Sequence, residues 1–140
     1  TPVEVSILAS IVKEETIKSE EMPRIAGVYI NRLERGMRLQ ADPTIKFAIG
    51  DFSVNRVLDK HLQKDSPYNT YRNAGLPPGP ISFPSITAIE SVLNYEKHDY
   101  FYFSARPDFS GYHNFSKTHY QHIQNARKYQ KALNEKKIME

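Results

Sequence analysis

The 140-residue chain lacks several features that would place it in specialised classes of protein. It has no cysteine, so it forms no disulfide, although this absence is also compatible with an oxidising compartment. No stretch approaches the 18 or more apolar residues of a membrane span, and no signal-peptide pattern is present. The excess of charge is small, a net +3, which suits an anionic polymer but does not by itself indicate one. Internal repeats and low-complexity tracts are also missing.

What is present describes an ordinary globular domain. Charged residues make up 25% of the chain and hydrophobic residues 39%, and the length predicts a single domain over residues 1–140 that buries a real core. Since the chain begins at Thr1 without an initiator methionine, we expect it to be a fragment or a processed form. Hydrophobic periodicity and turn residues predict an α+β, mainly helical fold. The predicted elements are helices over 3–18, 21–35, 85–94 and 118–137, a short helix over 54–62, a loop over 64–84 and a hairpin over 100–116. Residues 37–44 are expected to be extended chain or loop, with Pro43 ending any regular structure.

Glu15 is the most informative residue, because it is a carboxylate on an apolar helix face. When residues 3–19 are written as a helix, the side chains of Ile7, Leu8, Ile11 and Val12 form one stripe, and Glu15 falls close to its centre. Burial raises the pKa of a carboxyl group, and a glutamic acid that keeps its proton near neutral pH is suited to general-acid catalysis. The alternative from this segment alone is that Glu15 ends a fraying helix and reaches water.

Four segments of the chain together resemble a known family. They are LASIVKEET at 8–16, NRLERGMRLQADPT at 31–44, SPYNTYRNAGLPPGPI at 66–81 and YFYFSARPDFSGYHNFS at 100–116. In this order and spacing they resemble the catalytic domain of the MltG (YceG-like) endolytic lytic transglycosylases of bacterial cell walls. Many members read V-E-K-E-T where this chain has Lys13 in place of the first glutamate. The second glutamate aligns with Glu15, which the resemblance therefore implies to be the catalytic acid.

The resemblance implies a fold and a function as well. The fold would be a lysozyme-like catalytic domain, with a long Pro/Gly-rich loop along its groove, and the membrane anchor and LysM-like region that usually precede it would be absent from this segment. The reaction would cleave the β-1,4 bond between N-acetylmuramic acid and N-acetylglucosamine without water, leaving 1,6-anhydro ends and terminating or processing nascent strands. The expected partners are peptidoglycan strands and cell-wall synthases, the location is the extracytoplasmic face of the bacterial inner membrane, and no cofactor is required.

The 64–84 loop is the first candidate wall of a glycan groove. Its segment Tyr68, Asn69, Thr70 and Tyr71 pairs flat aromatic faces with amide and hydroxyl groups. Sugars need this mixture, because their rings stack on aromatic side chains and their hydroxyl and N-acetyl groups form hydrogen bonds. The alternative is a rigid structural loop whose tyrosines pack inward. With the resemblance we favour the groove wall.

The second candidate wall is the segment around Gln40, Asp42 and Thr44. Gln40 and Thr44 offer hydrogen-bonding groups, and Asp42 would permit an ordinary two-carboxylate hydrolysis if it lay across a groove from Glu15. We favour a turn or positioning role for Asp42. His113 lies in a segment that resembles the family's His-x-Phe-Ser motif, so it is a further candidate for a place beside the groove.

Other functions are less well supported by the sequence. We expect no metal site: His119 and His122 lie three residues apart on one predicted helix, but no further residues nearby complete the three or four ligands that zinc requires. Nucleic-acid binding is disfavoured, because the net charge is small and the basic residues cluster on the last helix. Two rivals to a lytic transglycosylase remain, a hydrolytic muramidase and a non-catalytic module that binds peptidoglycan.

Overall fold

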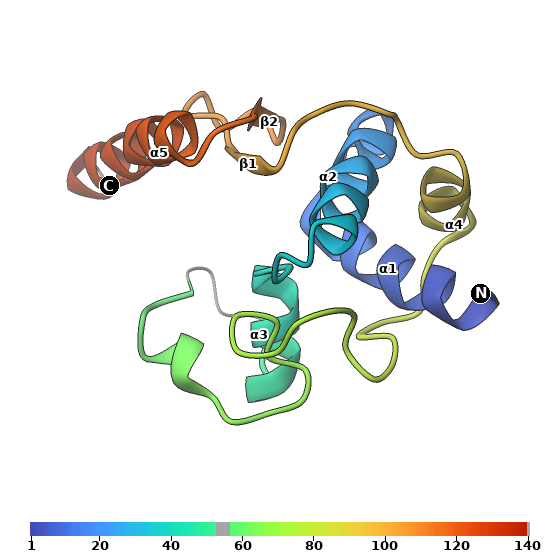
Figure 1. The fold of residues 1–140 in the computed structure, drawn as a ribbon. Helices are drawn as coiled ribbons and strands as arrows, with labels where there is room; N and C mark the ends of the chain where they lie inside the picture. The colour runs from blue at the N-terminus through green and yellow to red at the C-terminus, as the bar shows by residue number, and fades with distance from the viewer. Residues whose placement is uncertain (53–56, 140) are drawn as a thin grey trace.

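Three helices form the core of the protein, which is described here by a computed structural model covering residues 1–52 and 57–139. Helix α1 (Pro2–Glu15) packs against α2 (Met22–Glu34) and α4 (Ile86–Leu93), and α2 also contacts α4 (Figure 1). The predicted stripe of α1 is buried as expected, with Ile11 and Val12 fully inaccessible to solvent. Fully buried members of this core include Ala9, Ile25, Ala26 and Ala88. Apolar residues from the segments that follow α2 complete the core.

The four long predicted helices are confirmed, with differences at their ends. Helix α1 ends at Glu15, three residues earlier than expected, because Thr16 adopts an extended conformation with φ −148°. A short 3-10 helix, η1 (Ser19–Glu21), then leads into α2. Helix α4 begins where Ser85 accepts a hydrogen bond from the backbone N–H of Ala88 at 3.1 Å, the usual role of serine at a helix start.

The interpretation of residues 37–44 was partly wrong. Residues 37–41 have no helix or strand, as expected, but helix α3 (Asp42–Ile49) begins at Asp42, and Pro43 lies in its first turn instead of ending regular structure. Proline is well tolerated there, because its fixed φ matches a helix and the missing N–H would have no partner in the helix. Gly50 ends α3 with a left-handed backbone at φ 76°.

The predicted hairpin is confirmed as a two-stranded antiparallel sheet. Strand β1 (Tyr102–Ala105) pairs with β2 (His113–Ser116), with Phe103 opposite Phe115. Helix α5 (His119–Met139) packs mainly on these two strands and projects away from the three-helix core, so that its C-terminal end lies at the far side of the molecule (Figure 1).

The connection between α3 and α4 has little regular structure. The predicted loop at 64–84 contains no helix or strand, as its prolines and glycines indicated. The short helix predicted over 54–62 falls partly on residues 53–56, which lie outside the described part of the chain. Its described remainder holds only the start of a 3-10 helix, η2 (His61–Gln63). Among the helices of the described residues, none has the length and apolar character needed to cross a membrane.

Candidate active site

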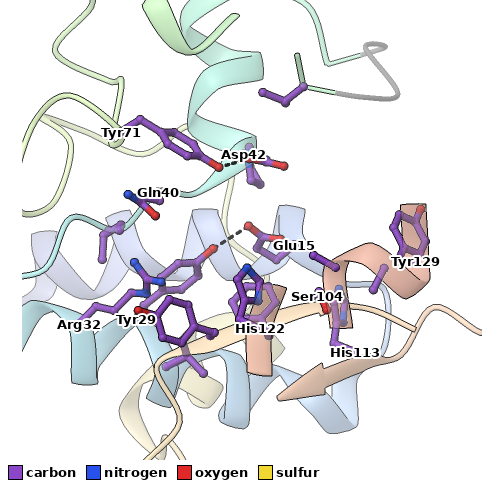
Figure 2. Close-up of a pocket in the computed structure, with 18 of the residues that line it drawn as sticks. Glu15, Tyr29, Arg32, Gln40, Asp42, Tyr71, Ser104, His113, His122 and Tyr129 are labelled. Carbon is purple, nitrogen blue, oxygen red and sulfur yellow. Dashed lines mark hydrogen bonds between the residues drawn. The ribbon is translucent and has the colours of Figure 1, made fainter. Parts of the chain in front are cut away.

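A cavity of about 490 Å³ lies between two walls that rise from the three-helix core. Helix α3 and the 64–84 loop form one wall, and the hairpin with α5 forms the other, while α1 and α2 supply the floor (Figure 2). Glu15 projects from the floor toward the space between the walls (Figure 2). The cavity therefore gathers side chains from segments that are far apart in the sequence.

Glu15 is the last residue of α1, and its carboxyl group is placed to bind and release a proton. Its Oε1 accepts a hydrogen bond of 2.6 Å from the hydroxyl of Tyr29 on α2. Burial raises the pKa of Glu15 to about 7, with a smaller upward effect from the carboxylate of Asp42, while the Tyr29 hydrogen bond and Lys46 act in the opposite direction. Glu15 does end its helix, as the alternative interpretation proposed, but its carboxyl group lines a cavity in the protein. With a pKa of about 7, this group exists in both its protonated and its ionised form near neutral pH.

Asp42 and Tyr71 form a second carboxyl–tyrosine pair on the facing wall (Figure 2). The Tyr71 hydroxyl donates a hydrogen bond of 2.5 Å to Asp42 Oδ1. The surrounding protein raises the pKa of Asp42, because it shields the carboxylate from water, although the Tyr71 hydrogen bond lowers that pKa. The sequence left open where Asp42 lies relative to Glu15, and in the structure the two residues face each other across the cavity.

Gln40 also lines this wall and has an unusual backbone. Its φ of 50° lies in the left-handed region, which costs about 1 kcal/mol or more for a residue other than glycine. The hydrogen bond from its N–H to the carbonyl of Thr70, at 3.2 Å, helps to hold this conformation. Strained residues of this kind are commonly found at functional sites.

Four residues predicted to bind substrate do not line the cavity. Thr44, Asn69 and Thr70 are buried, and Tyr68 packs its ring on Phe47 with centroids 4.7 Å apart. The hydroxyl of Thr70 accepts a hydrogen bond from Ala41 N–H at 2.9 Å and lies 2.8 Å from the hydroxyl of Thr44. The Asn69 side chain bonds three backbone groups, those of Leu62, Lys64 and Tyr71. These side chains hold Gln40, Asp42 and Tyr71 in place.

The wall formed by the hairpin contains residues that the sequence did not single out. Five consecutive residues, 101–105, line the cavity. Because side chains alternate along a strand, this continuity means that β1 contributes residues from both of its faces to the lining. Ser104 and His122 lie on this wall, and within the described part of the chain the Oγ of Ser104 and the Nδ1 of His122 are buried without a hydrogen-bond partner.

Tyr29 and His122 illustrate why these residues were missed. Tyr29 follows the apolar period of α2, so its sequence position indicated a core residue, and its ring is indeed buried against Phe103 with centroids 5.7 Å apart. From the sequence His122 was considered only as a metal ligand, whereas its ring stacks on that of Tyr102, with centroids 5.1 Å apart, beside the cavity. Helical spacing gives the direction of a side chain but not the position of a hydroxyl or ring nitrogen at its end.

His113 was predicted to lie beside the groove, and it lines the cavity from β2. A buried carboxylate fixes its ring: Glu21, at the start of α2, accepts hydrogen bonds from the His113 backbone N–H and from Nδ1, both at 2.9 Å. Because a carboxylate only accepts, Nδ1 carries the proton, and Nε2 is the nitrogen left for other partners. The pair also ties the hairpin to the core.

A second hollow of about 400 Å³ adjoins the first. Both hollows share Glu14, Glu15, Ala105, His113 and Tyr129. The second one lies between the segment that follows α1 and the turn of the hairpin, since Ile17, Arg106 and Tyr112 line it. Glu15 therefore stands where the two hollows adjoin.

No group of three or more histidine, aspartate or glutamate side chains capable of holding a metal ion occurs in residues 1–52 and 57–139. The polar side chains that line the cavity include carboxylic acids, hydroxyl groups, imidazoles and the cations Arg32 and Lys46.

Comparison with known proteins identifies the family. The profile of the YceG-like family matches residues 1–128. The chain belongs to this family. A crystal structure of a yceG-like protein from Listeria monocytogenes superposes with a TM-score of 0.79 at 43% sequence identity, over 84% of this chain and 38% of that one. The α+β arrangement of this chain, with its helices and small antiparallel sheet, is thus consistent with the YceG-like fold.

Two curated YceG-like relatives carry a functional name. The endolytic murein transglycosylase of Bacillus subtilis (strain 168) is 43% identical over 129 residues, and that of Streptococcus pneumoniae serotype 2 is 44% identical over 106 residues. These alignments cover 92% and 73% of this chain but only 35% and 19% of the relatives. The chain thus spans about a third or less of the length of either protein.

Proposed function

We propose that residues 1–140 act as the catalytic unit of a lytic transglycosylase that cleaves peptidoglycan, with Glu15 as its acid and base. The observation that carries this proposal is the carboxyl group of Glu15, which has a pKa of about 7 and stands at the junction of two hollows. A group that exchanges its proton near neutral pH can serve in both halves of such a reaction. The relatives named as endolytic murein transglycosylases support the same conclusion.

In the first step Glu15 donates its proton to the glycosidic oxygen between N-acetylmuramic acid and N-acetylglucosamine. The bond to C1 breaks with its electrons passing to that oxygen, and C1 develops oxocarbenium character. The Glu15 carboxylate then takes the proton of the C6 hydroxyl of the same muramic acid, and that oxygen bonds to C1. The product is a 1,6-anhydro ring, and Glu15 regains its proton. Because the nucleophile belongs to the substrate, no water has to be recruited.

The residues around Glu15 suit these two steps. The Tyr29 hydroxyl donates to Glu15 Oε1 and stabilises the carboxylate that forms after the first proton transfer. On the facing wall Gln40, Asp42 and Tyr71 offer hydrogen-bonding groups to a sugar, and β1 borders the other side. We propose that these walls form a lysozyme-like groove, with the 64–84 loop contributing Tyr71 to it.

A hydrolytic muramidase is the second candidate, favoured by one observation. Asp42 lies across the cavity from Glu15 and lines the same space, so it has a position from which it could activate water. Its Oδ1 already accepts the hydrogen bond of Tyr71, which lowers the pKa that burial raises and makes Asp42 a weaker base than burial alone would. We therefore favour the reaction without water and give Asp42 a positioning role.

The setting follows from the substrate. Peptidoglycan lies outside the cytoplasmic membrane, so we place this chain at the extracytoplasmic face of the bacterial cell envelope. Processing of nascent strands would bring it close to the cell-wall synthases, which are the partners we propose. Endolytic cutting, the mode named for the relatives, is part of this proposal.

Mass spectrometry of digested peptidoglycan tests this function directly. The parent chain and the Glu15→Gln variant are incubated with purified peptidoglycan, and the fragments are compared. Anhydro-ended fragments from the parent, reduced at least about 10²-fold in the variant, are expected. The amide oxygen introduced by Glu15→Gln can still accept the Tyr29 hydrogen bond, so the variant should remain folded. Glu90→Gln, at an exposed position of α4 outside both hollows, serves as the control.

The fragments also separate the alternatives. Reducing-ended products would identify a hydrolase and turn attention to Asp42. A folded Glu15→Gln variant with near-normal release of anhydro fragments would remove Glu15 from the catalytic role. If strands bound without any turnover by the parent, a peptidoglycan-binding module would remain.

A further inference from the structure

The second hollow differs in character from the cavity beside it. Two of its lining side chains are large, apolar and exposed: Ile17 is 87% and Phe109 is 44% accessible to solvent. Both lie in irregular segments, Ile17 just after α1 and Phe109 in the turn of the hairpin, where φ is 57°. Exposed apolar side chains that line a hollow next to an active site commonly mark a surface for a ligand. An aliphatic side chain such as Ile17 offers nothing to the hydroxyl groups of a sugar.

Cations accompany these apolar side chains. Arg106 lines the hollow, with its Nε donating to the carbonyl of His113 at 3.3 Å and its guanidinium 5.4 Å from the ring of Tyr112. Lys18 lies on the same ring, with Nζ 4.9 Å from its centroid. Lys13 also lines the hollow, although its Nζ already donates to the carbonyl of Phe83 at 2.6 Å.

The nearby carboxylates leave Arg106 available for a ligand. Glu20 accepts a hydrogen bond from the Tyr112 hydroxyl, and Asp108 Oδ1 accepts one from the backbone N–H of Ser110 at 3.0 Å. Asp108 is close enough to Arg106 for an electrostatic interaction, but no ion pair joins them. Glu14 is the exposed carboxylate among the lining residues, and it could receive an amino group.

The close approach of the hairpin turn to the segment after α1 also indicates that the second hollow is a recess between them. Gly111 lines the hollow with φ 88°, and a Cβ atom on it would lie 3.1 Å from Cε of Lys18 and 3.9 Å from Ile17. The hairpin turn thus approaches the segment after α1 closely, and the hollow is the space that the two leave between them. Its connection to the first cavity passes Glu15 and His113.

We propose that the second hollow binds a short, carboxylate-bearing peptide attached to the glycan strand. The proposal rests on the proposed function, since it assigns the peptide substituent of the muramic acid to this hollow while the sugars occupy the cavity beside it. The guanidinium of Arg106 binds a peptide carboxylate, and small apolar side chains pack on Ile17 and Phe109. The hollow makes the enzyme prefer strands that carry peptides over strands from which the peptides have been removed.

The test compares two substrates that differ only in their peptides. Peptidoglycan strands are prepared intact or after an amidase has removed the peptides, and kcat/KM is measured for the parent, Arg106→Gln, Ile17→Ser and the control Lys128→Gln. Lys128 is an exposed cation of α5 outside both hollows, so its loss changes net charge equally. Arg106→Gln and Ile17→Ser should each lower kcat/KM about 3- to 10-fold on intact strands and leave it unchanged on stripped strands.

A binding experiment without turnover makes the two proposals separable. A synthetic muramyl dipeptide is titrated into Glu15→Gln while backbone amide signals are followed by NMR, and the same is done with Glu15→Gln combined with Arg106→Gln. Shifts at residues 17 and 109–112, weakened by the Arg106 substitution, are expected. If the parent cleaves neither substrate, the proposed function fails, and this titration still decides the role of the hollow. Equal kcat/KM of the parent on both substrates, or a titration that leaves 109–112 unmoved, would overturn the proposal.

Discussion

The carboxyl group of Glu15 is balanced between neighbours with opposite effects. Tyr29 donates a hydrogen bond to it and lowers its pKa, whereas burial and the charge of Asp42 raise that pKa to about 7. Each neighbour lies on a different element, α2 for Tyr29 and α3 for Asp42. The protonation state of the catalytic group is therefore a property of the tertiary structure.

The pH dependence of kcat/KM should report this balance. As a general acid Glu15 works in its protonated form, so the rate should fall as the pH rises through about 7. In Tyr29→Phe the carboxylate loses a donor, its pKa rises, and the falling limb moves to higher pH. In Asp42→Asn a repulsive charge is lost, the pKa falls, and the limb moves to lower pH. Rates measured from about pH 5 to about pH 9 check both directions, and limbs that moved the same way would contradict this account.

Ser104 offers a second residue-scale prediction with a matched control. The hydroxyl groups of Ser104 and Ser116 are both buried and have no hydrogen-bond partner among residues 1–52 and 57–139, but of the two only Ser104 lines the cavity. An unpaired buried hydroxyl costs free energy, so neither Ser→Ala variant should lower the free energy of unfolding. We expect Ser104→Ala to raise KM about 3- to 10-fold through the loss of one hydrogen bond to substrate, and Ser116→Ala to leave KM unchanged.

Steady-state kinetics and urea denaturation on the two serine variants decide the matter. A rise of KM in both variants would point to a shift of the hairpin, and no rise in either would remove Ser104 from substrate binding.

Sequence periodicity was sufficient to find Glu15 but not its partners. The stripe of Ile7, Leu8, Ile11 and Val12 defines the buried face of α1, and Glu15 continues it. The same kind of pattern on α2 marks Tyr29 as buried and says nothing of its hydroxyl. Whether that hydroxyl reaches Glu15 depends on the angle at which α1 and α2 cross, which no local pattern contains.

At the scale of elements, α3 shows how a local rule was applied in the wrong direction. Proline ends a helix when it follows one, but at the first turn it favours a helix start, and the residues after Pro43 continue as Thr44, Ile45 and Lys46 in helical conformation. The consequence is functional, because Asp42 becomes the first residue of α3 and faces the cavity. The 64–84 loop was predicted correctly as irregular. The sequence could not show which of its tyrosines packs inward, because this depends on the contact between Tyr68 and Phe47.

The junction between α3 and the 64–84 loop should respond strongly to the loss of one hydroxyl. Thr70→Val keeps the shape of the side chain but removes the acceptor of the Ala41 N–H and the partner of Thr44. We expect the free energy of unfolding to fall by about 1–3 kcal/mol, because buried polar groups lose their partner. The rate should fall as well, since Gln40 and Asp42 lose support. Thr87→Val, on the exposed face of α4, should change stability by less than about 0.5 kcal/mol in the same urea titration.

Across the whole molecule, the site is assembled from three groups of elements that pack differently. Helices α1, α2 and α4 form the common core, while α3 with its loop and the hairpin with α5 stand on either side of Glu15 (Figures 1 and 2). Helix α5 is held mainly through the two strands. Because the walls are joined chiefly through the core, a ligand that bridges them adds contacts that the free protein does not have.

Hydrogen exchange should reveal that bridging. When Glu15→Gln is saturated with peptidoglycan strands, the backbone amides of both walls should exchange more slowly, at 40–49 and 68–72 on one side and at 101–105 and 119–133 on the other. Helix α4 lies away from both hollows, so its amides should change little and provide the internal control. Protection of one wall alone would mean that the strand lies on the surface of that wall instead of in a groove between the two walls.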